Sequence, residues 1–227
     1  MTSGAVEILY RDDRTVAVSK PGGMLVHRTH EADEDGPFLL QEVRELAGAK
    51  VYPVHRLDRP TSGLVLFALS PEATRAWQEA LARPTTEKRY LAMVRGRTPD
   101  GWSSFRPLTS DRGVRRNART TFETLVRFGG FSLLTVRLHT GRRHQIRRHL
   151  AHCAHQVVGD SSYGKGGINR YLREEHGLPR LFLHARSLSI VHPETNERLR
   201  IDCPLAEDLS SFLERYPDFP SESLAEM

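Results

Sequence analysis

One carboxylate stands out among the residues whose type and position could do chemistry. Asp58 lies between Arg56 and Arg59, in a polar segment that leads into a continuous apolar run beginning at Leu64. Neighbouring cations favour the ionised form of a carboxylate. An ionised carboxylate at the mouth of a core strand can act as a nucleophile or a general base. From Asp58 alone, a turn residue in a surface ion pair is the commoner interpretation.

Other catalytic chemistries fit the sequence less well. His55, Asp58 and Ser62 have the residue types of a hydrolase triad, but they are crowded into one short segment and no Gly-x-Ser-x-Gly elbow is present. Residue types that bind zinc occur together later in the chain, at His149, His152, Cys153 and His155. No second ligand pair at structural-zinc spacing follows them. The glycine-rich residues 20–23 lack the pattern of a phosphate-binding loop. The sequence therefore predicts no metal and no cofactor.

A second polar segment, residues 140–150, has the spacing of a helix. On a helix, Arg143 and Arg147 lie one turn apart, and Ile146 belongs to an adjacent apolar stripe that faces inward. Arg147 thus borders the buried face, where a guanidinium needs a carboxylate partner. We predict that this partner is Asp58.

The positive charge is concentrated in one part of the chain. Residues 112–149 contain ten arginines, no lysine and one acid, a net charge of +9, whereas the whole chain carries +5 and the remainder therefore −4. Such a segment is typical of a polyanion-binding surface, and guanidinium groups suit phosphates and bases. A solvated face with scattered arginines is the alternative. Tyr90 follows two cations and could stack on a base, although a core tyrosine is the commoner interpretation.

The elements that must position these residues follow an irregular order. Strands are expected at 7–10, 15–18, 64–69, 90–94, 120–127, 132–138, 181–191 and 199–201, with a hairpin around Gly129-Gly130. Helices are expected at 38–47, 71–83 (capped by Ser70), 142–152 and 205–216. The absence of regular strand–helix alternation predicts an α+β fold, with helices flanking a mixed, largely antiparallel sheet. We expect a single domain over residues 1–216 and a flexible C-terminal tail over residues 217–227.

Length and composition exclude several protein classes. With 227 residues, 38% of them hydrophobic and 27% charged, the chain is of a size and composition typical of one soluble globular domain. It has no apolar stretch of the ~20 residues that span a membrane, and its first residues lack the features of a signal peptide. Cys153 and Cys203 provide no disulfide framework. We therefore expect a cytoplasmic monomer that does not bind membranes.

The segment His55-Arg56-Leu57-Asp58-x-x-Thr61-Ser62-Gly63 resembles the catalytic motif of the RluA family of pseudouridine synthases, and the resemblance extends from about Glu7 to Pro204. Further motifs follow the family's order: Lys20-Pro21-x-Gly23-x-x-Val26-His27, Lys88-Arg89-Tyr90-x-Ala92, Thr140-Gly141-Arg142-x-His144-Gln145-Ile146-Arg147, Gly159-Asp160-x-x-Tyr163-Gly164 and Leu183-His184-Ala185. Gln156 replaces a proline that the family usually has.

This resemblance implies an enzyme that isomerises a uridine of RNA to pseudouridine without a cofactor or a metal. The uridine is first flipped out of its stack. The resemblance makes Asp58 the catalytic carboxylate, as nucleophile or as base, and Arg147 the cation that keeps it ionised. The other residues that it places at the RNA are Tyr90, which would stack on the flipped base, Ile146, which would pack on it, Arg56, which would fill the gap left by the base, and His55, Arg142 and His144.

Two stretches further resemble the tRNA pseudouridine-65 synthase branch of the family. They are Leu25-Val26-His27-Arg28 together with Arg59-Pro60, and Asn169-Arg170-Tyr171 leading to His176-Gly177-Leu178-Pro179-Arg180-Leu181. This implies uridine 65 of tRNA as the target. The chain has no S4-like RNA-binding module, so we expect the catalytic domain itself to hold the RNA. A ribosomal RNA synthase of the same family and a non-catalytic RNA-binding protein on this scaffold are the alternatives.

Overall fold

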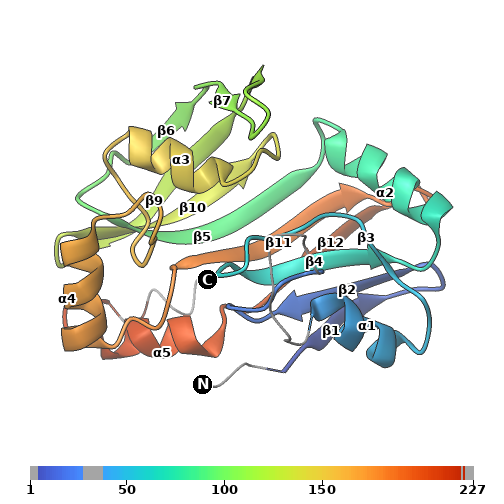
Figure 1. Ribbon diagram of the computed structural model, residues 1–227, viewed down its shortest axis with the longest axis horizontal. Coiled ribbons are helices and arrows are strands. Elements are labelled where there is room, and N and C mark those ends of the chain that lie inside the picture. The colour runs from blue at the N-terminus through green and yellow to red at the C-terminus, as the bar shows by residue number, and fades with distance from the viewer. Residues whose placement is uncertain (1–4, 28–37, 221, 223–227) are drawn as a thin grey trace. The chain divides into compact units, whose positions relative to one another are not determined.

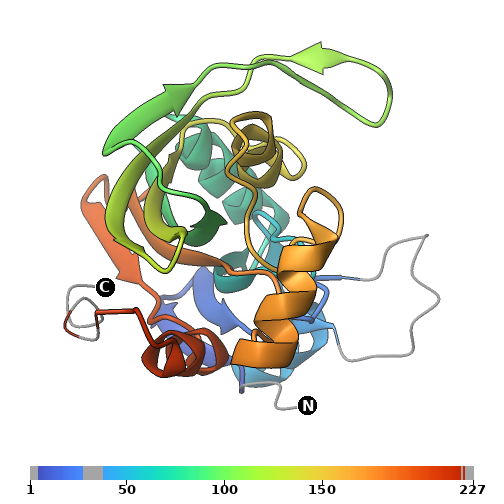
Figure 2. The ribbon, with the colours of Figure 1, turned by 90° about the vertical axis from the view of Figure 1, so that its left-hand side faces the viewer.

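The computed structural model describes residues 5–27, 38–220 and 222, so that Arg28 of the branch motif lies outside the described residues. Figure 1 labels most of its helices and strands, and Figure 2 shows them from a second side. In chain order they are β1 (Glu7–Arg11), β2 (Thr15–Lys20), α1 (Leu39–Ala47), β3 (Tyr52–Pro53), β4 (Ser62–Ala68), α2 (Pro71–Ala82), β5 (Glu87–Arg95), β6 (Gly101–Ser104), β7 (Leu108–Thr109), β8 (Arg115–Arg116), β9 (Thr120–Phe128), β10 (Phe131–Leu138), α3 (Gln145–His152), α4 (Gly166–His176), β11 (Leu183–Val191), β12 (Arg198–Asp202) and α5 (Glu207–Arg215). Among the described helices, none is long and apolar enough to cross a membrane.

The chain forms two compact units, each made from two separate stretches of sequence. Unit 1 contains Met1–Glu87 and Ala185–Pro204, and unit 2 contains Lys88–His184 and Leu205–Met227. The strand order is β1-β2-β4-β11 in unit 1, with β3 beside β4 and β12 beside β11, and β5-β10-β9-β6 in unit 2. Antiparallel pairing joins β1–β2, β2–β4, β3–β4 and β11–β12 in unit 1, and every neighbouring pair in unit 2. The predicted α+β class with a largely antiparallel arrangement is confirmed.

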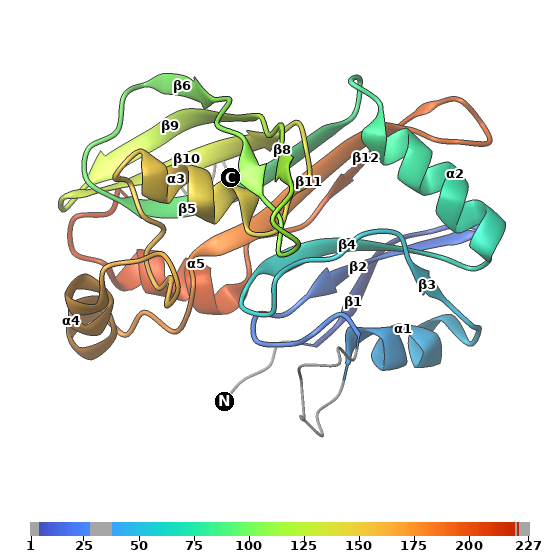
Figure 3. The same cartoon turned by 45° about the horizontal axis from the view of Figure 1, so that its top comes forward.

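The apolar run in the middle of unit 1 forms β4, a strand that is buried along its whole length. Leu64 and Leu66 belong to a hydrophobic cluster with Trp77 of α2. Val65 and Phe67 belong to a second cluster, which includes the buried face of α1, because successive side chains of a strand point to opposite faces. Figure 3 shows the two helices on opposite sides of this sheet. The prediction of a strand buried on both faces is confirmed.

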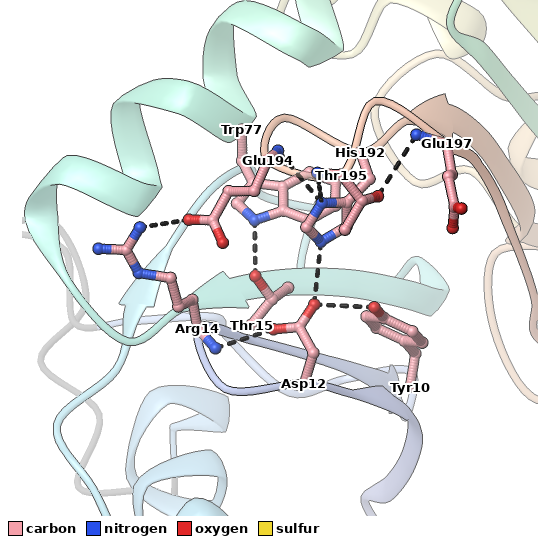
Figure 4. A network of polar contacts seen from close by, with 9 residues as sticks. All are labelled: Tyr10, Asp12, Arg14, Thr15, Trp77, His192, Glu194, Thr195 and Glu197. Carbon is pink, nitrogen blue, oxygen red and sulfur yellow. Dashed lines mark hydrogen bonds and ion pairs between the residues drawn. The ribbon is translucent and has the colours of Figure 1, made fainter.

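A network of polar contacts in unit 1 joins the β1–β2 turn to the β11–β12 turn (Figure 4). The Asp12 carboxylate accepts hydrogen bonds from the Tyr10 hydroxyl (2.8 Å) and from the backbone N–H of Arg14 (2.8 Å). Nε2 of His192 lies 3.0 Å from the same carboxylate, and Nδ1 accepts the backbone N–H of Glu194 (3.2 Å). Burial alone would raise the pKa of Asp12, but these partners lower it below 3.8. Both ring nitrogens of His192 are thus engaged in holding the two turns.

The sheet of unit 2 carries helices on both faces. Ile146 of α3 packs in one hydrophobic cluster with Val136 of β10. Leu172 of α4 and Phe212 of α5 pack in another cluster with Met93 of β5. The predicted hairpin at the two glycines joins β9 to β10. These two clusters form the core that supports the segment richest in arginine.

Between β6 and β9 the chain leaves this sheet and forms the short hairpin of β7 and β8 (Figure 2). Leu108 pairs with Arg116 and Thr109 with Arg115. The backbone N–H of Gly113 donates to Ser110 O (2.9 Å) and closes the tip. Two-residue strands in an arginine-rich stretch carry no clear alternation of apolar and polar residues, so the sequence did not indicate this hairpin.

Two helices differ from the expectation. The helix expected at 142–152 begins at Gln145, because His144 has a left-handed backbone (φ 52°) that a regular helix does not continue through. α4 was not predicted at all, since it begins with two glycines and buries only Asn169 and Leu172. The expected helices at 71–83 and 205–216 are present as α2 and α5, with ends shifted by one or two residues. Ser70 caps α2 as predicted, accepting the backbone N–H of Ala73 (3.1 Å).

Part of the expected C-terminal tail packs against unit 2. Phe219 is 6% exposed and meets Phe128 edge-to-face, with ring centroids 5.0 Å apart. Residue 221 and residues 223–227 of the tail lie outside the described residues. The packed part of the chain therefore extends beyond α5 to Phe219.

Candidate active site

Asp58 sits in a tight turn directly before β4. The backbone N–H of Thr61 donates to Asp58 O (3.0 Å), which closes the turn. Arg59 exchanges two hydrogen bonds with Gly23: Gly23 N–H donates to Arg59 O (2.8 Å), and Arg59 Nε donates to Gly23 O (2.9 Å). In Figure 3 the loops that follow β2 and precede β4 run side by side. The Asp58 turn is therefore held by a second loop that is far away in sequence.

Lys20 joins the same two loops from inside. Its side chain is fully buried, and its ammonium group donates to the carbonyl oxygens of Pro21 (2.8 Å), Met24 (2.8 Å) and Arg59 (3.1 Å). An ammonium has three N–H donors, and a buried one is costly unless they are satisfied. The Lys-Pro-x-Gly motif thus acts as a support for the Asp58 turn.

Gly63 allows β4 to approach another backbone segment of unit 1 very closely. Its φ is +111°, and a Cβ at this position would lie 2.3 Å from the carbonyl oxygen of Ala185. Real Cβ atoms do not come so close to a backbone oxygen. The backbone of the Leu-His-Ala motif therefore leaves room only for a glycine at position 63 of the Asp58 motif.

Replacing Gly63 by Ala is expected to lower the free energy of unfolding by at least about 2 kcal/mol, from backbone strain and steric overlap together. Urea unfolding measures the effect. Gly48→Ala is the matched control, because Gly48 also has a positive φ (+63°) but a Cβ there would meet nothing within 4 Å. Equal losses of unfolding free energy in Gly63→Ala and Gly48→Ala would show that the contact with Ala185 does not cause the destabilisation.

The remaining candidates of unit 1 differ in exposure. Nε2 of His55 accepts the backbone N–H of Leu66 (3.2 Å), so this ring helps to fix the loop to β4. Arg56 is exposed. Burial lowers the pKa of His27, and the charge of Arg56 lowers it further, which places these two residues near each other. Arg56 therefore has the exposure that contact with RNA requires.

In unit 2 the predicted base-contacting residues come together. Tyr90 is half-buried on β5, opposite Val136 of β10, and its ring borders the hydrophobic cluster that contains Ile146. Ile146 is 4% exposed. Two motifs that are more than fifty residues apart in sequence thus meet on one face of the sheet.

Arg147 forms a bidentate ion pair with Asp160. Arg147 Nε and Nη2 each lie 2.8 Å from a carboxylate oxygen, and the side chains are only 5% and 1% exposed. Burial would raise the pKa of Asp160, but the Arg147 hydrogen bonds and the backbone N–H groups of Tyr163 and Ser162 outweigh it and lower the pKa below 3.8. Sequence reasoning missed this partner. The predicted pairing of Arg147 with Asp58 would join the two units and stays a prediction.

Tyr163 extends the surroundings of Arg147. The guanidinium carbon lies 5.2 Å from the centre of the Tyr163 ring, and the Tyr163 hydroxyl lies 3.1 Å from Nδ1 of His144. Asn169 holds the same loop, since its side chain accepts the N–H of Gly159 (2.9 Å) and donates to Asp160 O (2.9 Å). The Gly-Asp-x-x-Tyr-Gly motif could have indicated these contacts, but its spacing does not say which arginine Asp160 binds.

Arg142 is exposed at the start of the arginine motif. Its Nε donates to Asn117 O (3.2 Å), and its backbone N–H donates to the side chain of Gln145 (3.1 Å). Buried Gln145 also donates to Arg119 O (3.0 Å). These contacts fix the loop before α3 to the segment that leads into β9.

His149, one of the histidines considered for zinc, has other partners. His149 is fully buried, with Nδ1 3.0 Å from Thr120 Oγ1 and Nε2 2.9 Å from Arg106 O. Burial lowers the pKa of His149. Within residues 5–27, 38–220 and 222, no three His, Cys, Asp or Glu side chains are grouped so that they could hold a metal ion. His149 therefore has a structural role.

Comparison with known proteins gives the chain relatives over most of its length. A model of the RNA pseudouridylate synthase family matches residues 14–152. The tRNA pseudouridine synthase C of Haemophilus ducreyi is 38% identical over 221 residues, covering 88% of this chain and 91% of the relative. The protein of the same name from Vibrio vulnificus is 35% identical over 247 residues, covering 96% and 98%.

The fold has solved counterparts as well. The structure of human RNA pseudouridylate synthase domain containing 4 has a TM-score of 0.74, covers 92% of each chain and is 24% identical. The structure of human RNA pseudouridylate synthase domain containing 1 has a TM-score of 0.73 and is 23% identical. The family match covers more than half of the sequence and includes the Asp58 turn and the helix that carries Arg147. On this basis the chain belongs to the RNA pseudouridylate synthase family, and its enzymatic activity is that of a pseudouridine synthase, an isomerase.

Proposed function

We propose that this enzyme converts uridine 65 of tRNA to pseudouridine and that Asp58 is its catalytic carboxylate. The observation that carries the substrate is the 35–38% identity, over most of the chain, to proteins named tRNA pseudouridine synthase C. The observation that supports Asp58 is its turn, which Lys20 and Gly23 hold through Arg59. A rigid loop holds a catalytic carboxylate in a fixed position relative to the reacting atom of the substrate.

The reaction is balanced without any external group. The N1–C1′ bond of the uridine breaks, the base turns, and C5 forms a bond with C1′. The C5 proton is lost to solvent and N1 gains a proton, so product and substrate are isomers. Asp58 either attacks C1′ or removes a ribose proton on the way to a glycal intermediate.

The other candidates are assigned to RNA binding. Tyr90 stacks on the flipped base, Ile146 packs against it, and Arg147 keeps Asp58 ionised. Arg56 occupies the gap that the base leaves in its stack, because a planar guanidinium can stack on bases. His55, Arg142 and His144 line the RNA path. Under this proposal the two units serve as one catalytic domain.

Mapping of pseudouridine tests the substrate. The purified enzyme is incubated separately with unmodified tRNA and with ribosomal RNA, and pseudouridine is located chemically. Modification of tRNA at position 65 supports the proposal, whereas modification of ribosomal RNA alone identifies a ribosomal RNA synthase. Release of tritium from RNA labelled at uridine C5 distinguishes an enzyme from a non-catalytic RNA-binding protein, since only turnover frees this hydrogen.

Affinity for tRNA is expected to fall steeply with salt. Each phosphate contact contributes roughly 0.7 log units of affinity per log unit of salt for single strands and about 0.9 for duplex. Arg115 and Arg116 are exposed in the basic segment, so the double variant to alanine should have a shallower slope. Arg44→Ala, an exposed arginine of α1 outside that segment, is the control. A slope that is flat for the wild type would rule out this surface as the RNA site.

We also expect the enzyme to work in the cytoplasm as a monomer without binding membranes. Both cysteines are thiols in the structure, Cys203 buried and Cys153 half-buried, which suits a reducing compartment. Light scattering of the purified enzyme, alone and with tRNA, measures the oligomeric state.

A further inference from the structure

Phe105 is the most exposed of the large hydrophobic side chains in the described ranges. It is 63% exposed and lies between β6 and β7. The guanidinium carbon of Arg119 lies 5.3 Å from the centre of its ring. A cation at this distance from a ring is attracted by the ring's electrons. Phe105 and Arg119 therefore form a ring–guanidinium pair on the surface of unit 2.

The backbone on both sides of this pair is anchored by α3. Nε2 of His149 donates to the carbonyl oxygen of Arg106 (2.9 Å), directly after Phe105. The side-chain amide of Gln145 donates to the carbonyl oxygen of Arg119 (3.0 Å). His149 and Gln145 are both buried. An exposed ring on an anchored backbone loses little freedom when it binds a ligand.

The surroundings of the ring are strongly basic. Seven exposed arginines lie between residues 106 and 143: Arg106, Arg112, Arg115, Arg116, Arg119, Arg142 and Arg143. The only acid of the hairpin tip, Asp111, is engaged by Arg143 at 2.6 Å. This charge matches a polyanion and opposes a basic or apolar protein partner.

We infer that Phe105, backed by Arg119, is a stacking platform for an unpaired base of the RNA substrate, a base other than the target uridine. Aromatic rings that stack bases inside a basic surface are a common means of holding single-stranded nucleotides. The β7–β8 hairpin, with Arg115 and Arg116, would contact the neighbouring phosphates. The inference rests on the proposed function only for the identity of the RNA, which is tRNA.

Phe105→Ala is expected to weaken tRNA binding by roughly 5- to 150-fold, the range for loss of one stacked base. The slope of affinity against salt should stay that of the wild type, because stacking releases no counterions. Phe105→Trp should retain the affinity, and the fluorescence of the new indole should be quenched when tRNA binds. Filter binding at several salt concentrations measures the first two quantities.

Leu125→Ala is the matched control, because Leu125 is also an exposed apolar residue of unit 2 (48% exposed) but its aliphatic side chain has no ring that could stack on a base. Its tRNA affinity should equal that of the wild type. Thermal unfolding of all variants should be unchanged, since the side chains are exposed.

Three results would overturn the inference: wild-type affinity in Phe105→Ala, an equal loss in Leu125→Ala, or dissociation of a dimer by Phe105→Ala, which would make the ring a protein contact. The same tRNA is assayed for pseudouridine with the wild-type enzyme. If the wild type forms none while Phe105→Ala still weakens binding, the proposed function fails and the platform stands.

Discussion

Asp58→Asn should reduce pseudouridine formation by at least about 100-fold while leaving tRNA affinity within about twofold. Asparagine has nearly the same shape but can neither accept a proton nor attack C1′ as a carboxylate does. The turn should survive, because its hydrogen bond uses the backbone oxygen of Asp58 and not the side chain. Tritium release from RNA labelled at uridine C5 measures turnover, and filter binding measures affinity.

Asp13→Asn is the control for a general loss of negative charge in unit 1, since Asp13 is exposed in the turn between β1 and β2. It should turn over like the wild type. Turnover of Asp58→Asn near the wild-type rate would contradict the assignment of Asp58. Loss of binding and turnover together, with a lowered unfolding temperature, would mean that Asp58 supports its loop and does not act on the RNA.

The second large effect is expected for Asp160→Asn, which leaves Arg147 as a buried cation without its bidentate partner. Breaking a buried ion pair by removing one member typically costs about 3–5 kcal/mol of folding free energy. Urea unfolding at neutral pH measures the loss. Asp208→Asn is the control, because Asp208 also binds an arginine of unit 2 in bidentate fashion, Arg180, but is 32% exposed. Asp208→Asn should lose clearly less free energy of unfolding than Asp160→Asn, because its ion pair is more exposed to solvent.

The loss in Asp160→Asn should depend on pH. The pKa of Asp160 is lowered in the folded protein, so its ionised form contributes its full stability above the ordinary value of 3.8. This contribution disappears as the pH falls through the folded pKa. The difference in unfolding free energy between wild type and variant should therefore be constant near neutral pH and shrink in strong acid. A difference that grows in acid would show that Asp160 is not stabilised as a carboxylate.

The sequence predicts those parts of the fold in which local signals, such as apolar runs and helix caps, agree with the packing of the core. The Leu64–Leu69 run could only be a buried strand, and Ser70-Pro71 marks the start of α2, where the cap forms as expected. α4 is not predicted because it begins with two glycines and has one buried apolar residue, Leu172, which gives no helical pattern of apolar residues. The β7–β8 hairpin is not predicted because its two-residue strands carry no clear alternation of apolar and polar residues. Part of its support comes from α3, where Arg148 donates to Thr109 O (3.0 Å).

The residues of the candidate site likewise fall into those that the sequence predicts and those that it does not. Residue types and motif order select Asp58, Tyr90 and Arg147. They do not reveal the roles of Lys20 or Asp160, since these roles depend on contacts with Arg59 and with Arg147, which other segments of the chain provide. A buried lysine with three carbonyl partners has the same sequence signal as an exposed one. Such support becomes visible only when the loops are placed in space.

The division of the chain between the units has a consequence for its synthesis. Residues 185–204 complete unit 1, but the ribosome makes them after the whole stretch 88–184 of unit 2. Until then β4 lacks the neighbour β11 that the finished sheet provides, and an apolar strand with an open edge invites aggregation. Nascent chains thus carry the turn of Asp58 on an unfinished sheet until almost all of the protein has been translated.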